Sequence, residues 1–243
     1  MENRSLTLGV TGRRHVVPEA WNDVKRATRD ALKAVAQSFD GEIRVCSGLA
    51  IGADSLVAQL ALELKDSAPN SNVRLVGVLP FDAERYKRDF KTTPAPDGIS
   101  QRDAFCALLG RCDETIVLAD PDADALDPLS GYVRLGEWLV ENCDLLFALW
   151  NGNAAIVKRG GTVDVALKKT GRCQRDGSRV YCVATPELLR KKRQDGVKIY
   201  TPEPIEGAGR VALLDDAPKG DIAFVDSVQG VRELRDWILS RNR

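Results

Sequence analysis

Short β-branched runs alternate with longer helical stretches along most of this sequence, and this alternation constrains the fold more than any other feature. A strand, a helix and a parallel strand form a βαβ unit, and repeated units give a parallel sheet with helices on its faces. The pattern therefore predicts an α/β protein with a doubly wound, mostly parallel sheet. We expect its strands at Leu6–Val10, Ile43–Cys46, Val73–Leu79, Glu114–Leu118, Asp144–Trp150 and Arg179–Val183.

Helices are expected between and after these strands. The first begins near Pro18, a residue that suits the first helical turn, and its apolar residues recur at spacings of three and four. Further helices are expected at about Ala53–Leu64, Ser100–Leu109, Tyr132–Glu141, from Thr162 onward, and at about Val228–Leu239. Loops are expected at Lys91–Gly98, Asp120–Gly131 and Gly171–Ser178.

The 243 residues suit one α/β domain. We expect a single domain over 1–243, with a core at about 6–184 and a C-terminal extension at about 185–243. The extension holds two short apolar runs, Val211–Leu214 and Ile222–Val225, before its helix. Its sequence assigns it no function.

The composition restricts the class of partner. Lysine plus arginine (35) equals aspartate plus glutamate (35), so no global field attracts nucleic acid or an acidic membrane. No apolar segment approaches the ~20 residues that span a bilayer, and no signal-peptide stretch opens the chain. We expect a cytoplasmic protein. The six cysteines contain no C-x-x-C pair and His15 is the sole histidine, so no metal site is expected.

Three loops that follow predicted strands are rich in glycine and small polar residues: Thr11–His15, Ser47–Asp54 and Asn151–Thr162. In an open parallel sheet, ligands bind beyond the carboxyl ends of the strands, near the point where strand order reverses. A helix N-terminus carries partial positive charge and unpaired N–H donors, and glycine lets the backbone approach an anion. Together the three loops favour a site for a phosphate-bearing ligand.

Familiar nucleotide and metal motifs do not fit. The loop Gly9–Arg14 lacks the third glycine of the dinucleotide fingerprint, and Ser47–Asp54 is not followed by the Gly-Lys-Ser/Thr of a Walker A sequence. The acidic stretch from Asp120 resembles the opening of an EF-hand loop, but Ala125 stands where glycine is required, so we expect a solvated turn. We expect no cofactor.

Several segments, taken in order, form a more specific pattern. They are Gly9-Val-Thr-Gly-Arg-Arg14, Ser47-Gly-Leu-Ala-Ile-Gly-Ala-Asp54, Val78-Leu-Pro-Phe81, Tyr86 with Asp89-Phe90, Tyr132 with Gly136, Cys143-Asp144 leading to Trp150-Asn-Gly152, and Gly160-Gly-Thr-Val-Asp-Val165. The pattern resembles the SLOG superfamily, which includes the DNA-processing protein DprA and the LOG phosphoribohydrolases, and in particular its bacterial signalling and defence-associated members. The resemblance covers roughly residues 6–184.

This resemblance implies a Rossmann-like sheet of the SLOG or LOG type whose pocket, at the C-terminal edge of the sheet, binds a nucleotide or a nucleotide-derived, ADP-ribose-like ligand. Trp150 and Tyr86 are candidates to stack a base. The resemblance and the loops together assign ligand binding to Thr11, Gly12, Arg13, Arg14, Ser47, Gly48, Leu49, Gly52, Ala53, Asp54, Pro80, Phe81, Trp150, Asn151, Gly152, Gly160, Gly161 and Thr162.

Two departures from the family pattern bear on activity. Arg13 replaces the usual histidine, and Val165 stands where the LOG enzymes have the glutamate that takes part in cleaving the N-glycosidic bond. Asp164 is one residue earlier, but one residue along a helix turns a side chain by ~100°. Asp54 and Asp164 remain the candidate catalytic carboxylates.

Three hypotheses stay open. The first is a ligand-binding sensor or signalling module that acts as a homo-oligomer or with a separate effector protein. The alternative is a LOG-like phosphoribohydrolase that cleaves a nucleoside monophosphate. The third is a DprA-like binder of single-stranded DNA, which the neutral net charge disfavours.

Overall fold

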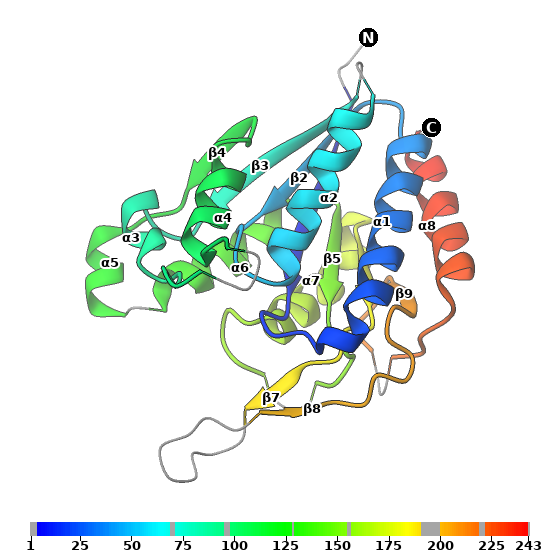
Figure 1. Ribbon diagram of the computed structural model, residues 1–243. Helices are drawn as coiled ribbons and strands as arrows, with labels where there is room; N and C mark the ends of the chain where they lie inside the picture. Colours follow the sequence, from blue (N-terminus) through cyan, green and yellow to red (C-terminus); the bar gives the residue numbers. More distant parts are fainter. Residues whose placement is uncertain are drawn as a thin grey trace.

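The structure is a computed structural model that describes residues 4–68, 71–94, 98–127, 129–154, 157–190, 200–218 and 222–242. Its main sheet has seven strands in the order β4-β3-β2-β1-β5-β6-β9 (Figure 1). The strands are β1 Ser5–Gly12, β2 Glu42–Ser47, β3 Val73–Leu79, β4 Glu114–Val117, β5 Leu145–Leu149, β6 Arg179–Val183 and β9 Val211–Leu214. All neighbours pair in parallel except β9, which is antiparallel to β6.

Strand order reverses beside β1. From β1 the chain adds β2, β3 and β4 on one side, and then returns to place β5 and β6 on the other side. The carboxyl ends of β1 and β5 therefore form the switch point at which doubly wound sheets bind ligands. This order confirms the predicted doubly wound, mostly parallel α/β fold.

Helices cover both faces of the sheet (Figure 1). Helices α1, α2 and α8 share one buried apolar cluster with alternate residues of the strands, and α6 and α7 share another. The helices are η1 Pro18–Ala20, α1 Trp21–Ser38, α2 Ala53–Ser67, α3 Ala83–Lys87, α4 Gln101–Leu109, α5 Pro121–Leu126, α6 Ser130–Asn142, α7 Thr162–Asp176 and α8 Ser227–Arg241. A separate antiparallel pair consists of β7 Leu188–Arg190 and β8 Tyr200–Pro202.

Strand β5 shows why the sequence of a central strand in this sheet is a continuous apolar run. Leu145, Phe147 and Leu149 pack into the cluster of α1, α2 and α8, whereas Leu146 and Ala148 pack into that of α6 and α7. Successive side chains of a strand point to opposite faces, so a strand covered on both faces needs apolar residues at every position.

The acidic segment Asp120–Gly131, which we expected to be a loop and a solvated turn, contains the helix α5 and the start of α6. The Asp120 side chain accepts a hydrogen bond from the Ala123 amide, and Pro121 occupies the first helical position. Aspartate followed by proline is thus a helix start in this context, although the same residues favour turns.

One further expectation needs correction. The expected loop Gly171–Ser178 is helical as far as Asp176, because Cys173 continues the buried face of α7, and the helix ends only at Gly177 with a φ of 70°. Of the two apolar runs in the C-terminal extension, Val211–Leu214 forms β9, and Val225 of the run Ile222–Val225 forms an isolated bridge with Val211. The sequence also missed α3 and the β7–β8 pair, which are short.

The C-terminal residues pack against the sheet. Strand β9 extends the sheet beyond β6, and Leu234 and Ile238 of α8 are fully buried against α1 in the first apolar cluster. Among the residues that the structure describes, no helix combines the length and apolarity needed to cross a membrane.

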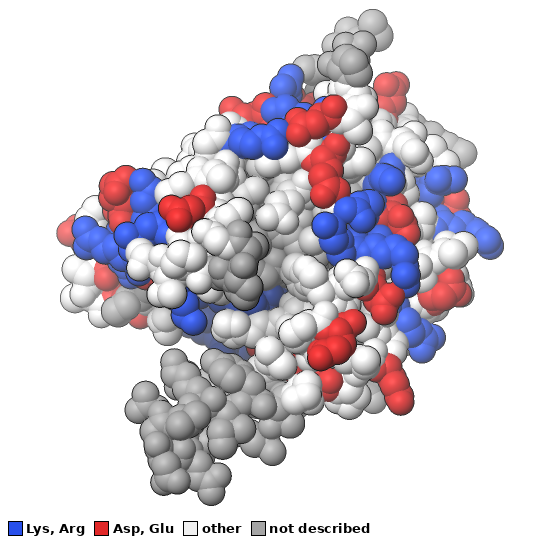
Figure 2. Space-filling model, in the orientation of Figure 1, with Lys and Arg blue, Asp and Glu red and all other residues white. Residues whose placement is uncertain are grey.

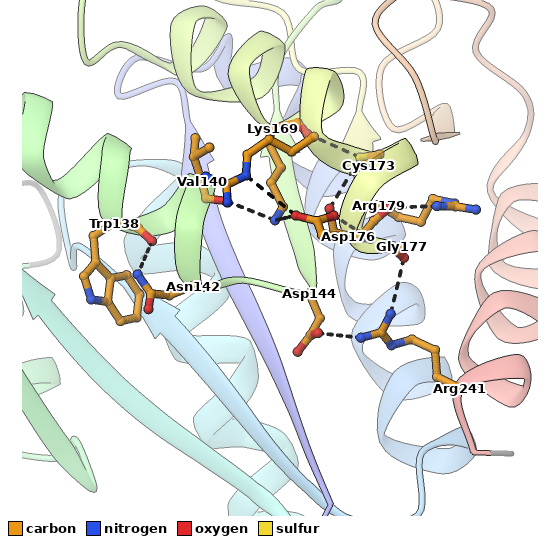
Figure 3. A network of polar contacts seen from close by, with 12 residues as sticks. Trp138, Val140, Asn142, Asp144, Lys169, Cys173, Asp176, Gly177, Arg179 and Arg241 are labelled. Carbon is orange, nitrogen blue, oxygen red and sulfur yellow. Dashed lines mark hydrogen bonds and ion pairs between the residues drawn. The ribbon is translucent and has the colours of Figure 1, made fainter.

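A polar network joins α6, α7 and α8 at the end of the sheet opposite the switch point (Figure 3). The Lys169 side chain is only 1% exposed, and its Nζ donates to the carbonyl of Val140 at 3.0 Å and lies 3.5 Å from a carboxylate oxygen of Asp176. Arg241 of α8 donates to Asp144, whose other oxygen accepts the Thr7 amide of β1. Val140 stands in the last turn of α6, where the carbonyls have no partner within the helix, and Lys169 of α7 supplies the donor.

We expect Lys169→Met to lower the free energy of unfolding by roughly 1–3 kcal/mol, because it leaves the buried Val140 carbonyl without its charged donor. The matched control is Lys168→Met. The Lys168 side chain is 44% exposed and its ammonium pairs with Asp164, so this substitution should cost at most about 1 kcal/mol. Urea denaturation measures both. Equal losses in the two variants would show that the buried contact does not stabilise the fold.

Candidate functional site

A cavity of about 480 Å³ opens at the carboxyl ends of β1 and β5. Its walls come from four parts of the chain: the loop Thr11–His15 after β1, Asp54 in the first turn of α2, one side of α6, and the segment Lys158–Thr162 at the start of α7. Glu187, which precedes β7, closes a further part of the wall. The cavity therefore lies at the switch point of the sheet, where the fold class predicts a ligand.

The loop after β1 is held between β5 and α2. The Arg13 amide donates to the Leu149 carbonyl at 3.2 Å, and the Ala53 amide donates to the Arg13 carbonyl at 3.1 Å. A Cβ on Gly12 would lie 2.3 Å from the Cβ of Ala53, so glycine is required for α2 to approach this closely. Thr11, Gly12, Arg13 and Arg14 all line the cavity, as the sequence predicts for ligand-binding residues.

The second glycine loop reaches the cavity mainly through Asp54. The Ser47 hydroxyl accepts the Leu49 amide and donates to the Asp54 carbonyl, and the Gly48 carbonyl accepts the Tyr86 hydroxyl. Leu49 has a φ of 55° and a buried side chain. Ser47, Gly48 and Leu49 do not line the cavity, and neither do Gly52 and Ala53, which pack against the backbone of the first loop. Tyr86 does line the cavity, but it is only 1% exposed.

The expected residues around Trp150 lie apart from the cavity. Trp150 is 1% exposed, and its indole N–H donates to the Asn153 carbonyl, so it stands in the core and not where a base would stack. The Asn151 amide donates to Glu203, and Gly152 packs against Phe224.

Pro80 and Phe81 also lie outside the cavity and support its α6 wall. The Phe81 ring meets the Tyr132 ring edge-on at 5.4 Å between centroids. A Cβ on Gly131 would lie 2.5 Å from the Pro80 carbonyl oxygen, so α6 begins in close contact with this turn.

The start of α7 forms the opposite wall of the cavity. Gly160 has a φ of 70°, and a Cβ there would lie 3.0 Å from the backbone of Val133 on α6, so this glycine serves the fold. Gly161 and Thr162 begin the helix and line the cavity. Gly161 has a φ of −87°, which any residue can adopt.

The two candidate carboxylates occupy different environments. Asp164 does not line the cavity: one of its oxygens accepts the Gly160 amide at 2.9 Å and the Lys168 ammonium at 2.8 Å. Burial opposes its ionisation, but these two contacts outweigh that effect and lower the pKa of Asp164. Its neighbour Val165 does line the cavity.

Asp54 lies in the cavity with a perturbed pKa. Burial raises the pKa of its carboxyl to about 7, although Arg14 and a hydrogen bond from the Ala50 backbone favour the ionised form. The Arg14 guanidinium lies over the Tyr132 ring, 5.3 Å from its centroid. A carboxyl that titrates near neutral pH can either donate or accept a proton in the cavity.

Some cavity residues escaped the sequence analysis of the site. Lys158 and Arg159 are exposed cations. They come directly before Gly160 and Gly161, which lead into α7, and this position in the sequence could have identified them. Tyr132 and Gly136 were noticed only as a helix pattern: Tyr132 lines the cavity, and Gly136 makes room for Val165 of α7. Glu187 carries no signal in the sequence. No group of three or more metal-ligating side chains occurs among the described residues.

The pKa of Asp54 predicts a pH-dependent stability. Because its pKa in the folded protein, about 7, exceeds the usual 3.8, folding binds a proton between these values and stability falls as pH rises through this window. Asp54→Asn removes the effect, so it should stabilise the protein relative to wild type above pH 7, by an amount on the order of a few kcal/mol, and little near pH 4.

Denaturant titrations of the wild type and the variant from pH 4 to pH 8 measure this difference. A difference in unfolding free energy that does not change with pH would contradict the assigned environment of Asp54.

No family model matches the chain, and no curated protein matches it. A solved structure of DNA processing protein A (DprA) from Streptococcus pneumoniae is similar, with 14% identity and a TM-score of 0.40 over 79% of this chain. The match spans 52% of that chain, about half its length. The fold assignment rests on the strand order and pairing described above.

Proposed function

We propose that the protein binds a nucleotide or nucleotide-derived, ADP-ribose-like ligand in this cavity and serves as a sensor or signalling module of the SLOG type. One observation carries the proposal: cationic side chains from two separate loops and the N-terminus of a long helix meet in one cavity at the switch point. Its volume, about 480 Å³, lies within the range of roughly 300–1,000 Å³ typical of small-molecule sites.

The wall at the start of α7 suits a phosphate. The first-turn amides of a helix have no partner within the helix, and the helix dipole favours an anion there. Thr162 adds a hydroxyl, and Lys158 and Arg159 add positive charge at the same wall. Arg13 faces the cavity from the loop after β1.

The α6 wall suits the base of a nucleotide. Tyr132, Leu135 and Leu139 line this side, and Val165 of α7 adjoins them. An aromatic ring beside aliphatic side chains offers a base both stacking and apolar contact. We therefore propose that the base lies against this wall, beside the Tyr132 ring that the Arg14 guanidinium partly covers, and not at Trp150 or Tyr86.

The surface favours a small ligand over nucleic acid as the main partner. On the face shown in Figure 2, basic and acidic side chains are interspersed over α1 and α8, and the net charge of the whole chain is zero. A binder of a nucleic acid backbone needs a continuous basic surface. For the sensor role, we propose that a second copy of the chain or a separate effector protein receives the signal of ligand binding.

Lys158→Gln tests the phosphate wall. We expect it to weaken AMP and ADP-ribose binding roughly 3- to 10-fold, because it removes a cation beside the phosphate, and to leave adenosine binding unchanged. Isothermal titration calorimetry measures all three ligands. The matched control is Lys33→Gln, at an exposed position on α1 that does not line the cavity.

Wild-type protein that binds neither AMP nor ADP-ribose would refute the proposed function. If Lys158→Gln weakened adenosine binding as much as AMP binding, Lys158 would not act on the phosphate, and the phosphate would lie at another wall of the cavity.

The environment of Asp54 favours a second function, cleavage of the N-glycosidic bond of a nucleoside monophosphate. Its pKa of about 7 would allow the protonated carboxyl to donate to the leaving base. Against this function, the apolar Val165 occupies the cavity position of the LOG glutamate, and Asp164 is engaged by Gly160 and Lys168.

We expect AMP to survive prolonged incubation with the protein, as monitored by chromatography of the free base. Base release that disappears in Asp54→Asn would establish the hydrolase instead. Base release that persists in both Asp54→Asn and Asp164→Asn would place the catalytic group elsewhere.

A further inference from the structure

Glu187 brings the C-terminal extension into the cavity. It lies beyond residue 184, where the family resemblance ends, yet it lines the cavity beside the loop after β1. One of its carboxylate oxygens lies 3.2 Å from Nη1 of Arg13, and the two side chains are 22% and 23% exposed. This ion pair is therefore largely shielded from solvent and holds one end of the guanidinium.

The opposite edge of the same guanidinium includes a donor that the protein does not satisfy. Nε of Arg13 is buried and has no hydrogen-bond partner among the described residues. In arginine, Nε–H and Nη2 form the edge that contacts phosphate or carboxylate with two parallel hydrogen bonds, whereas Nη1 lies on the other side. A buried donor without a partner costs stability, and a ligand oxygen in the cavity that Arg13 lines would remove this cost.

The backbone around Glu187 is braced from three sides. Its amide donates to Glu203 at 2.8 Å, and the other carboxylate oxygen of Glu203 accepts the side-chain amide of Asn151 at 2.7 Å. The adjacent Leu188 amide donates to the His15 carbonyl at 2.9 Å, and Glu187 forms an isolated bridge with Val16. The segments before β7 and after β8 are thus tied to the ends of β1 and β5.

We propose that Glu187, braced by Glu203, is a positioning residue that orients Arg13 so that its Nε–Nη2 edge binds the phosphate of the ligand. This inference rests on the proposed function and extends the site to the C-terminal extension. It also explains how an arginine is accommodated at position 13, where the family that the sequence resembles has a histidine. The carboxylate of Glu187 holds this arginine, and Glu187 lies outside the segment that the resemblance covers.

Two substitutions of Glu187 test whether it orients Arg13 or only balances its positive charge. Glu187→Ala removes the contact to Arg13, whereas Glu187→Gln keeps an oxygen acceptor of the same size and removes the negative charge. If Glu187 orients Arg13, we expect Glu187→Ala to weaken AMP binding roughly 5- to 20-fold. Glu187→Gln should restore wild-type affinity or exceed it, since it also removes repulsion of the phosphate.

The third variant is Arg13→Gln, in which Glu187→Ala should have no further effect on AMP affinity, because the group that it orients is gone. Adenosine, which lacks the phosphate, should bind the wild type and Glu187→Ala equally, and thermal unfolding reports whether each variant is folded. Calorimetry with AMP and adenosine gives the affinities.

The possible results separate failure of the proposed function from failure of the role assigned to Glu187. Wild-type protein without affinity for AMP or ADP-ribose refutes the proposed function and this inference together. Wild-type binding of AMP that Glu187→Ala leaves unchanged or strengthens refutes the inference alone, because Glu187 would then be only a counter-ion. Equal weakening of AMP and adenosine, or the same loss in the Arg13→Gln background, also refutes it, since a general structural role predicts those results.

Discussion

The close contact between Gly12 at the end of β1 and Ala53 at the start of α2 determines the geometry of the whole site. A side chain at Gly12 would overlap Ala53, and one at Gly52 would come within 2.4 Å of the Arg13 carbonyl. Because neither residue carries one, the Arg13 carbonyl can accept the first amide of α2, and the loop can place Arg13 and Arg14 over the ends of β1 and β5. The same contact brings Asp54, one residue into α2, beside Arg14.

The glycines of the second loop serve this packing as well. A Cβ on Gly48 would lie 3.0 Å from the carboxylate of Asp54 and 2.9 Å from Leu135 of α6, so glycine leaves the space in which the carboxyl sits. The loop that looked like a phosphate clamp in the sequence therefore acts indirectly, by burying Asp54. Burial then raises the pKa of Asp54, which reduces negative charge in a cavity that we propose for an anion.

The sequence predicted the sheet well because the middle of each long strand is buried on both faces and reads as a short, mostly apolar run. It predicted Thr11–Arg14 and Gly160–Thr162 as wall residues because loops at the carboxyl ends of parallel strands meet at one edge. It could not separate a glycine that lines the cavity, such as Gly161, from one that packs against a helix, such as Gly48, because both stand in similar glycine-rich loops. Trp150 was misplaced for a similar reason: a tryptophan at a strand end can point to the core or to the cavity.

Glu187 could not be predicted, because it enters the site through a tertiary contact far from the sequence pattern. Its partner Arg13 is separated from it by most of the chain, and the hydrogen bonds that fix it come from Glu203 and the backbone. The site is thus built from a sheet that local sequence encodes and from a C-terminal segment that only the folded structure brings into place.

A crystal structure of the protein with ADP-ribose would show directly whether the cavity holds the phosphate of such a ligand. The account predicts a phosphate within hydrogen-bond distance, about 3 Å, of the amides in the first turn of α7 and of Nε of Arg13, with the base against Tyr132. A ligand bound outside this cavity, or one whose phosphates point away from both Arg13 and α7, would contradict it.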